Sequence, residues 1–158
     1  MGFLAANLAV ACSGALFRPG AWYESLAKPR WRPPNWLFGP AWAVLYVMIA
    51  FAGWLVWREK GFAGAGVALA LYAGQLLLNA IWSWLFFGLR RMDLAFFDLI
   101  ALWLAILATI LAFAPHHAGA AWMMVPYLAW VTFAGALNFA VWRLNVPLRR
   151  AGTTGDAA

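Results

Sequence analysis

Five long apolar runs restrict what this chain can fold into. They cover residues 2–17, 35–57, 62–88, 94–114 and 119–143, with polar residues, glycine or proline between them. A helix needs about 20 apolar residues to cross a bilayer, and the last four runs are that long. The strands of a membrane barrel would instead alternate in units of about 10 residues. The runs predict an all-α integral membrane protein, a five-transmembrane-helix bundle.

Composition supports this class and excludes others. The chain is 66% hydrophobic and 10% charged, whereas about a quarter of a soluble domain is charged. The net charge of +6 does not indicate nucleic-acid binding, because the basic residues stand in short segments rather than on one continuous face. The single cysteine, Cys12, excludes an internal disulfide and a CxxC site. His116 and His117 are adjacent in a connecting segment without further ligands, so no metal site is expected.

The basic residues also predict an orientation. With five spans, the segment 18–34 (loop 1), the segment before residue 94 and the C-terminus share one side of the membrane. That side holds nine of the 11 basic residues, namely Arg18, Lys28, Arg30, Arg32, Arg90, Arg91, Arg143, Arg149 and Arg150. Because Lys and Arg concentrate in cytoplasmic loops, loop 1 and the C-terminus are expected in the cytoplasm and the N-terminus outside. The first run lacks a basic flank, so we interpret it as a retained helix and not a signal peptide.

The chain divides into a bundle and a tail. Residues 1–145 form the expected membrane domain, and residues 146–158 are polar or small and are predicted to be a flexible tail. Loop 1 is long beside the other connections, and long loops often carry function. We therefore predict that loop 1 acts as a lid over one end of the bundle.

The stretch KPRWRPPNWLFGPAW, residues 28–42, stiffens the entry to the second run. Pro33 and Pro34 fix φ, and Asn35 suits a helix N-cap. Trp42 and Tyr46 are one turn apart and share a helix face. Such aromatic walls suit a flat, apolar, polycyclic ligand. Interfacial anchoring and packing are an equally good interpretation of the same rings.

Amides inside the apolar runs need hydrogen-bond partners. Gln75 and Asn79 share one helix face, while Asn138 and Asn145 lie in or beside the last run. Bonds between helices are the first interpretation, and orientation of a ligand is the second. Asp98 lies near the start of its run, where pairing with Arg90 or Arg91 is expected.

Small residues recur every four positions in the third run, at Gly66, Ala70 and Gly74. Such a stripe lets two helix backbones approach closely. It predicts either packing inside the chain or a homodimer interface.

Several motifs together resemble the translocator protein family (TspO/MBR, also called the peripheral benzodiazepine receptor family). They occur in order over residues 18–145. The matching stretches are Trp22-Tyr23, Lys28-Pro29, Trp31-x-Pro33-Pro34, Gly39-Pro40-x-Trp42, Tyr46, Leu78-Asn79-xx-Trp82, Phe86-Phe87-Gly88, Pro126-Tyr127-Leu128-Ala129-Trp130, Phe133-Ala134-xx-Leu137-Asn138 and Trp142-Arg143-x-Asn145. The absence of a long extension favours a bacterial-type member.

The resemblance implies a five-helix bundle, usually a homodimer, with a pocket closed by loop 1. Members bind porphyrins, and many bind sterols and benzodiazepine-type drugs. The implied ligand is a porphyrin, either protoporphyrin IX or haem, with no obligatory cofactor. The implied pocket residues are Tyr23, Trp31, Trp42, Tyr46, Asn79, Trp130 and Ala134. The family's sterol-linked pattern has a tyrosine where this chain has Phe139.

These features favour a membrane tetrapyrrole-binding translocator or sensor, with the ring between the first, second and fifth runs and stacked on Trp42 and Trp130. Lys28, Arg30 and Arg32 are then candidates for contacts with the propionates. One alternative is a light- and oxygen-dependent porphyrin-degrading enzyme, an activity reported for some bacterial members, with Trp42 and Trp130 as the oxidisable residues. The other alternative is a structural or partner-recruiting membrane protein.

Overall fold

Six helical elements follow one another in the structure, a computed structural model that describes residues 2–16 and 20–155, with side chains at 2–12 and 20–146. They are α1 (Gly2–Leu16), α2 (Ala21–Ser25), α3 (Asn35–Ser83), the π-helical turn η1 (Trp84–Gly88), α4 (Met92–Phe113) and α5 (Ala118–Gly155). None of the described residues forms a strand. The all-α prediction is confirmed.

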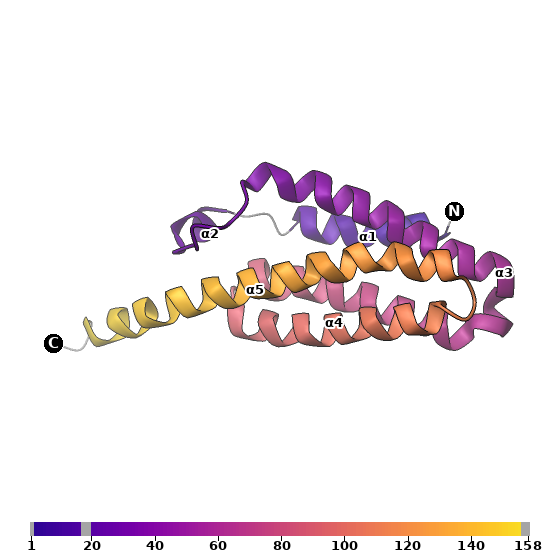
Figure 1. The fold of residues 1–158 in the computed structure, drawn as a ribbon. Coiled ribbons are helices and arrows are strands. Elements are labelled where there is room, and N and C mark those ends of the chain that lie inside the picture. Colours follow the sequence, from indigo (N-terminus) through magenta and orange to yellow (C-terminus); the bar gives the residue numbers. More distant parts are fainter. Residues whose placement is uncertain (1, 17–19, 156–158) are drawn as a thin grey trace.

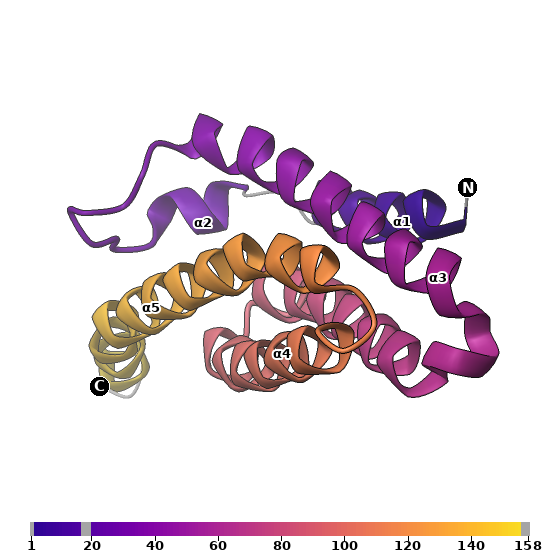
Figure 2. The same cartoon turned by 45° about the vertical axis from the view of Figure 1, so that its right-hand side comes forward.

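Helix α3 contains both the second and the third apolar run. It bends back on itself at Gly61, whose φ of 62° and ψ of −173° are non-helical, and again at Ala65. Glycine adopts a positive φ without steric cost, so the bend falls at this residue. The first arm (35–60) and the second arm (62–83) therefore lie as two rods of the bundle beside α1, α4 and α5 (Figures 1 and 2).

The rods are long and apolar enough for a membrane. Within the described residues, three stretches qualify as spans by length and hydropathy, namely Asn35–Gly88, Met92–Phe113 and Ala118–Val146. The first of them includes both arms of α3. Helix α1 has 15 residues, or about 22 Å, which is shorter than a hydrocarbon core of about 30 Å. Its sequence-predicted last residue, Phe17, lies outside the described residues.

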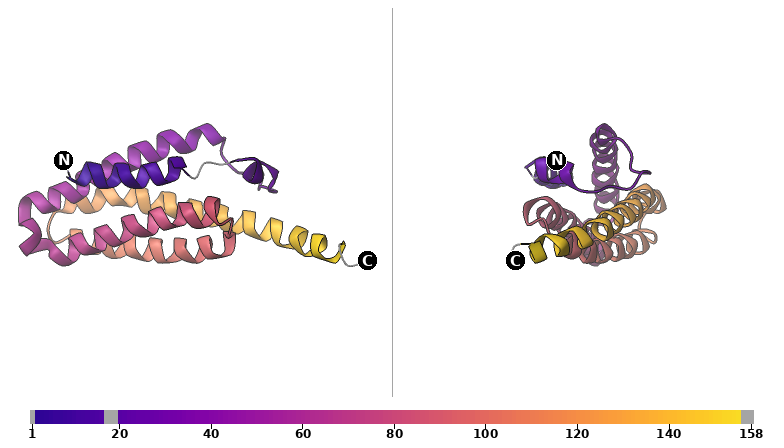
Figure 3. Two further views of the ribbon diagram at one scale, coloured as in Figure 1. Left: turned by 180° about the vertical axis from the view of Figure 1, so that it is seen from behind. Right: turned by 90° about the vertical axis from the view of Figure 1, so that its left-hand side faces the viewer.

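The connections sort to two ends of the bundle (Figures 1 and 3). Loop 1 with α2, the turn before α4 and the end of α5 lie at one end, while the N-terminus, the bend of α3 and the turn before α5 lie at the other. The first of these is called the lid end below. Lys28, Arg30, Arg32, Arg90, Arg91 and Arg143 all belong to its segments. The prediction of orientation from the basic residues requires these segments to share one end of the bundle, as they do.

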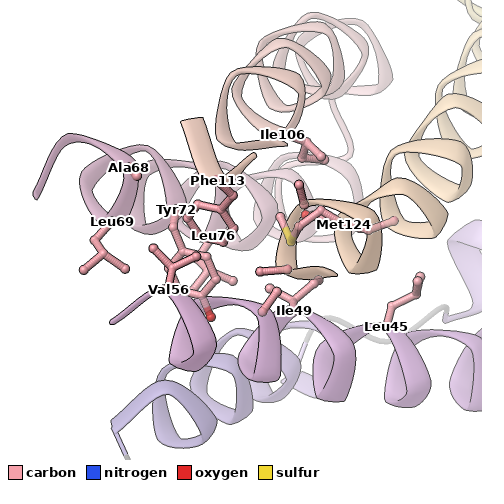
Figure 4. Packing of buried hydrophobic residues seen from close by; sticks show 14 of the residues in the cluster. Leu45, Ile49, Val56, Ala68, Leu69, Tyr72, Leu76, Ile106, Phe113 and Met124 are labelled. Atoms are coloured by element: carbon pink, nitrogen blue, oxygen red, sulfur yellow. The ribbon is translucent and has the colours of Figure 1, made fainter. Parts of the chain in front are cut away.

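The apolar core fills the half of the bundle away from the lid. Ile49 and Val56 of the first arm of α3 are completely buried against the second arm, α4 and α5 (Figure 4). Ile106 and Phe113 of α4 contribute equally buried side chains. A second, smaller cluster at the lid end joins Tyr23 to Phe86, Met92, Ala95, Leu137 and Val141. Dense packing in one half thus leaves the other half free to hold a cavity.

Gly53 marks the closest approach of α1 and the two arms of α3. A Cβ atom built on Gly53 would lie 2.8 Å from the ring of Tyr72 and 3.0 Å from the ring of Phe3. On the same side, Asn7 Nδ2 donates a 2.6 Å hydrogen bond to the Tyr72 hydroxyl. This contact fixes α1 against α3.

Three local predictions are corrected. Loop 1 contains the short helix α2, which the sequence did not indicate. Pro34 and not Asn35 is the N-cap of α3, because the Asn35 side chain is engaged elsewhere, with Arg32 at 3.0 Å and Glu24 at 3.3 Å. The backbone of α5 is helical to Gly155, beyond the predicted boundary at residue 145, and the flexibility of the tail stays a prediction.

The stripe of Gly66, Ala70 and Gly74 faces outward. All three residues are exposed, and a Cβ atom at Gly66 or Gly74 would meet nothing within 4 Å. Packing inside the chain therefore does not account for these small residues.

Candidate ligand-binding site

A cavity of about 630 Å³ lies in the half of the bundle nearest the lid. Sites for small molecules commonly measure about 300–1,000 Å³. Both arms of α3, η1 and α5 line the cavity. Ala11 of α1 contributes one wall position, and Tyr23 of α2 covers the cavity at the lid end. Residues from five elements therefore enclose one space.

The walls are aromatic. Trp42 stacks on Tyr46, with ring centroids 5.3 Å apart and planes at 25°. Trp130 of α5 meets Trp42 edge to face, at 6.4 Å and 84°. Phe38 also packs edge to face against Trp130, with ring centroids 5.8 Å apart. Trp42 and Trp130 thus form two nearly perpendicular walls, which corrects the expectation that a ligand lies stacked on both.

A hydrogen-bond network forms the floor. The Tyr46 hydroxyl donates to Asn79 Oδ1 at 2.9 Å, and Asn79 Nδ2 donates to the Tyr127 hydroxyl at 2.7 Å. The three side chains come from both arms of α3 and from α5. Asn79 is 3% exposed and Tyr127 is completely buried. The network joins three rods at the boundary between the cavity and the packed core.

Loop 1 covers the cavity. Tyr23 is buried with its ring against Phe86 at 6.2 Å and Phe87 at 5.7 Å. Lys28 Nζ donates to the carbonyl oxygens of Glu24 and Leu26 and lies 4.8 Å above the Tyr23 ring. Lys28 therefore stabilises the fold of the lid. It does not line the cavity, and neither do Arg30 and Arg32.

The structure brings together six of the seven pocket residues that the resemblance implied. Tyr23, Trp42, Tyr46, Asn79, Trp130 and Ala134 all line the cavity. Trp31 does not. It is 53% exposed and rests on the outer rim, with its ring 5.9 Å from that of Phe133.

The sequence did not predict that residues at the end of the third run line the cavity. Trp82, Ser83, Phe86 and Phe87 line the cavity, although the ligand was placed between the first, second and fifth runs. The π-helical turn η1 shifts Phe86 and Phe87 out of α-helical register, and π-helical turns often occur at functional sites. The motif that includes Trp82, Phe86 and Phe87 was the available signal.

The remaining amides have mixed outcomes. Asn138 Nδ2 donates to the Met92 carbonyl at 3.1 Å, which joins α5 to α4 as expected. Asn145 binds loop 1 at Ala27 and not another helix. Neither amide atom of the fully buried Gln75 has a partner among the described residues.

The expected pairing of Asp98 is wrong. Arg91 instead binds Asp93, with contacts of 2.9 and 2.7 Å to the two carboxylate oxygens. Asp93 is only two residues away and lies in the first turn of α4, where the helix dipole favours a carboxylate. Oδ2 of Asp98 is buried and has no hydrogen-bond partner in the described part of the chain.

The lining determines what the cavity can hold. Its polar groups are the hydroxyls of Tyr23, Tyr46 and Ser83, the indole N–H groups and the amides of Asn35, Asn79 and Asn138. The other lining residues are apolar, and none carries a carboxylate, ammonium, guanidinium or imidazole group. No group of three or more metal-ligating side chains occurs within the described residues. The cavity suits a flat, largely apolar molecule with a few polar substituents.

Comparison with known proteins agrees with this architecture. Residues 3–143 match the model of the TspO/MBR family. The chain is 46% identical over 145 residues to Protein CrtK of Rhodobacter capsulatus, which covers 87% of this chain and 89% of that protein. It is 44% identical over 143 residues to the Tryptophan-rich sensory protein of Cereibacter sphaeroides, with 90% and 89% covered. Identity to the human Translocator protein is 44% over 126 residues, with 78% and 75% covered. With its bundle of apolar helices and this match over nearly its whole length, the chain is an integral membrane protein that belongs to the TspO/MBR family.

Proposed function

We propose that this chain is a membrane translocator or sensor that binds tetrapyrroles in the cavity beneath loop 1. The observation that carries the proposal is the aromatic cavity itself, about 630 Å³ in volume, with Trp42 and Trp130 among its walls. Flat conjugated rings interact favourably with such walls by offset stacking and edge contacts. The names of two relatives, a sensory protein and a translocator protein, support the broader role.

The wall geometry refines how a porphyrin lies. One face of Trp42 is already covered by Tyr46, and the plane of Trp130 is nearly perpendicular to that of Trp42. A planar ligand therefore stacks on one indole and meets the other with its edge. Because the described lining carries no cationic side chain, the propionates are expected to point toward the lid end, where Arg30 and Arg143 are exposed.

A ligand screen on the purified protein tests the proposal. The chain has 12 tryptophans, so a bound porphyrin should quench their fluorescence saturably. Protoporphyrin IX, haem and coproporphyrin are titrated directly, and cholesterol and a benzodiazepine-type drug are added as competitors. We expect saturable quenching by porphyrins that a non-binding dye of similar absorbance does not reproduce. If no porphyrin binds in either detergent or lipid, a structural or partner-recruiting role replaces the proposed one.

A second candidate function is light- and oxygen-dependent porphyrin breakdown. It is favoured by one observation, which is that two oxidisable indoles, Trp42 and Trp130, line the cavity. The chemistry would depend on the excited porphyrin and oxygen, since the described lining offers no acid–base pair. Illumination of the loaded protein with and without oxygen distinguishes it. A defined product that requires oxygen and both tryptophans would establish it, and unselective bleaching would exclude it.

We also propose a homodimer through the second arm of α3. Gly66, Ala70 and Gly74 form an exposed stripe with open space above it, and such stripes let helices of two subunits pack closely. Ala70→Trp should convert a dimer to a monomer in size-exclusion chromatography with light scattering. The matched control is Ala101→Trp, at an exposed alanine of α4 outside the stripe. A dimer that survives Ala70→Trp would contradict this interface.

The proposed orientation places the lid end in the cytoplasm and the N-terminus outside. It is supported by the six described basic residues at that end and by the positive-inside tendency of membrane proteins. A reporter that is active only in the cytoplasm should be active when it is fused after Ala158. A reporter that is active only after export should be inactive at the same position, and its activity there would reverse the orientation.

A further inference from the structure

Loop 1 is tied to α5 by a pair of partly buried hydrogen bonds. The Ala27 backbone N–H donates to Asn145 Oδ1 at 3.0 Å, and Asn145 Nδ2 donates back to the Ala27 carbonyl at 2.9 Å. The two residues are 118 positions apart in the sequence. Asn145 thus pairs with the backbone N–H and the carbonyl oxygen of a single lid residue, through the oxygen and the nitrogen of its side-chain amide.

The Asn145 side chain is held in position for this contact. Its Nδ2 also donates to the Val141 carbonyl at 2.7 Å, so both N–H donors and the carbonyl oxygen are used. Asn145 is 5% exposed. Hydrogen bonds shielded from water contribute more than exposed ones because neither group can be solvated when the bond breaks.

The hydrogen bonds of Lys28 and Asn35 in the lid are of a different kind. Lys28 binds carbonyl oxygens of the lid itself. The bonds from Asn35 to Arg32 and Glu24 are exposed and join the lid to the start of the helix that follows it. The pair of Ala27 and Asn145 instead joins the middle of the lid to α5, one turn beyond the cavity-lining Val141.

From this geometry we infer that Asn145 is the latch of the lid, a positioning residue that holds loop 1 closed over the cavity and sets how fast a bound ligand leaves. The inference rests on the proposed function in taking a porphyrin as the ligand. Opening the lid requires Ala27 to leave Asn145 and Tyr23 to leave its pocket among Phe86 and Phe87. Affinity changes of this kind appear mainly in the dissociation rate.

Two substitutions test the latch. Asn145→Leu removes both bonds at similar volume. Asn145→Asp has nearly the same shape and keeps an acceptor for the Ala27 N–H, but it places a carboxylate oxygen against the carbonyl oxygens of Ala27 and Val141. If Asn145 acts through packing alone, Asn145→Asp should hold the lid closed as the wild type does. If Asn145 is a latch, the lid should open more readily in both variants. Where the Leu variant does not fold, the Asp variant carries the test.

Two measurements are made on each variant. The first is release of bound protoporphyrin IX, followed by stopped-flow fluorescence. Release should be about ten-fold faster in both variants, because Asn145→Leu loses both bonds to Ala27 and Asn145→Asp replaces one of them by a repulsion between two oxygens. The second needs no ligand. Of the basic residues at 28, 30 and 32, only Arg30 is not followed by proline, so trypsin cuts the lid after Arg30 alone. Cleavage there should accelerate by a similar factor, since it requires local opening.

Thr132→Val is the matched control. It breaks the 2.9 Å bond between Trp103 and Thr132, which joins α4 to α5 and does not involve the lid, and both rates should stay at the wild-type values. Faster cleavage with unchanged porphyrin release would overturn the inference, as would an Asp variant that matches the wild type. If the wild type binds no porphyrin, the proposed function fails, and faster cleavage in both variants then still supports the latch.

Discussion

Trp130→Ala is expected to weaken porphyrin binding by about 30- to 150-fold, the equivalent of roughly 2–3 kcal/mol. Trp130 forms one of the two perpendicular walls and is supported by Phe38, Trp42 and Phe133. Alanine removes the ring that a planar ligand contacts and leaves a space that the ligand does not fill. Trp130→Phe and Trp42→Phe keep an aromatic wall of smaller area, so each should cost only about 3- to 10-fold.

The measurement and control follow from the position of the ring. Affinity is read from the porphyrin absorption band, because a variant that lacks a cavity tryptophan would also change tryptophan quenching. Trp122→Ala is the matched control, since Trp122 lies on the same helix, is 73% exposed and does not line the cavity. Its affinity should equal that of the wild type. Unchanged affinity in both Trp42→Phe and Trp130→Phe would contradict the placement of the ligand.

The class of fold was predictable from the sequence because few structures can bury long apolar runs. In a bilayer every backbone group must be paired, so runs of about 20 apolar residues become helices. The boundaries were less predictable. A five-residue helix such as α2 has too few residues for a periodic pattern, and the π-helical turn η1 differs from an α-helix in register and not in composition.

The site was predictable in its residues and not in its shape. The motif resemblance named six residues of the lining, among them Trp42 and Ala134. A resemblance between sequences gives no angles between side chains, so the perpendicular arrangement of Trp42 and Trp130 became visible only in the structure. Trp31 was misplaced for a related reason, since its position depends on where loop 1 folds back. The contact of Ala27 with Asn145 joins residues 118 apart, and no local pattern encodes such a pair.

Asn79 has two roles that a single substitution separates. It lines the cavity, and it also joins Tyr46 to Tyr127 across three rods. Removing its amide leaves the hydroxyl of Tyr127, which is completely buried, without its Asn79 partner. A buried polar group that loses its partner costs about 1–3 kcal/mol, although hydrogen bonds between membrane helices average nearer ~0.6 kcal/mol.

Asn79→Leu should therefore lower the free energy of unfolding in detergent by about 1–3 kcal/mol, measured by loss of helical circular dichroism on addition of a denaturing detergent. Thr132→Val breaks another bond between helices, on the outer face of the bundle, and should cost nearer ~0.6 kcal/mol, the average for bonds between membrane helices. Comparing the stabilities of the two variants separates the cost of leaving a buried group unpaired from the contribution of the hydrogen bond itself.

A double-substitution cycle decides whether the network or the packing is responsible. Tyr127→Phe leaves Asn79 Nδ2 without its partner, so it also destabilises the protein. In the double variant of Asn79→Leu with Tyr127→Phe, neither group of that bond remains, and only the Tyr46 hydroxyl loses its partner. The double variant should then lose less stability than the sum of the single variants, with a coupling of about 0.5–2 kcal/mol. Strict additivity would mean that the two side chains contribute through shape alone, and the floor of the cavity would then be held by packing and not by its hydrogen bonds.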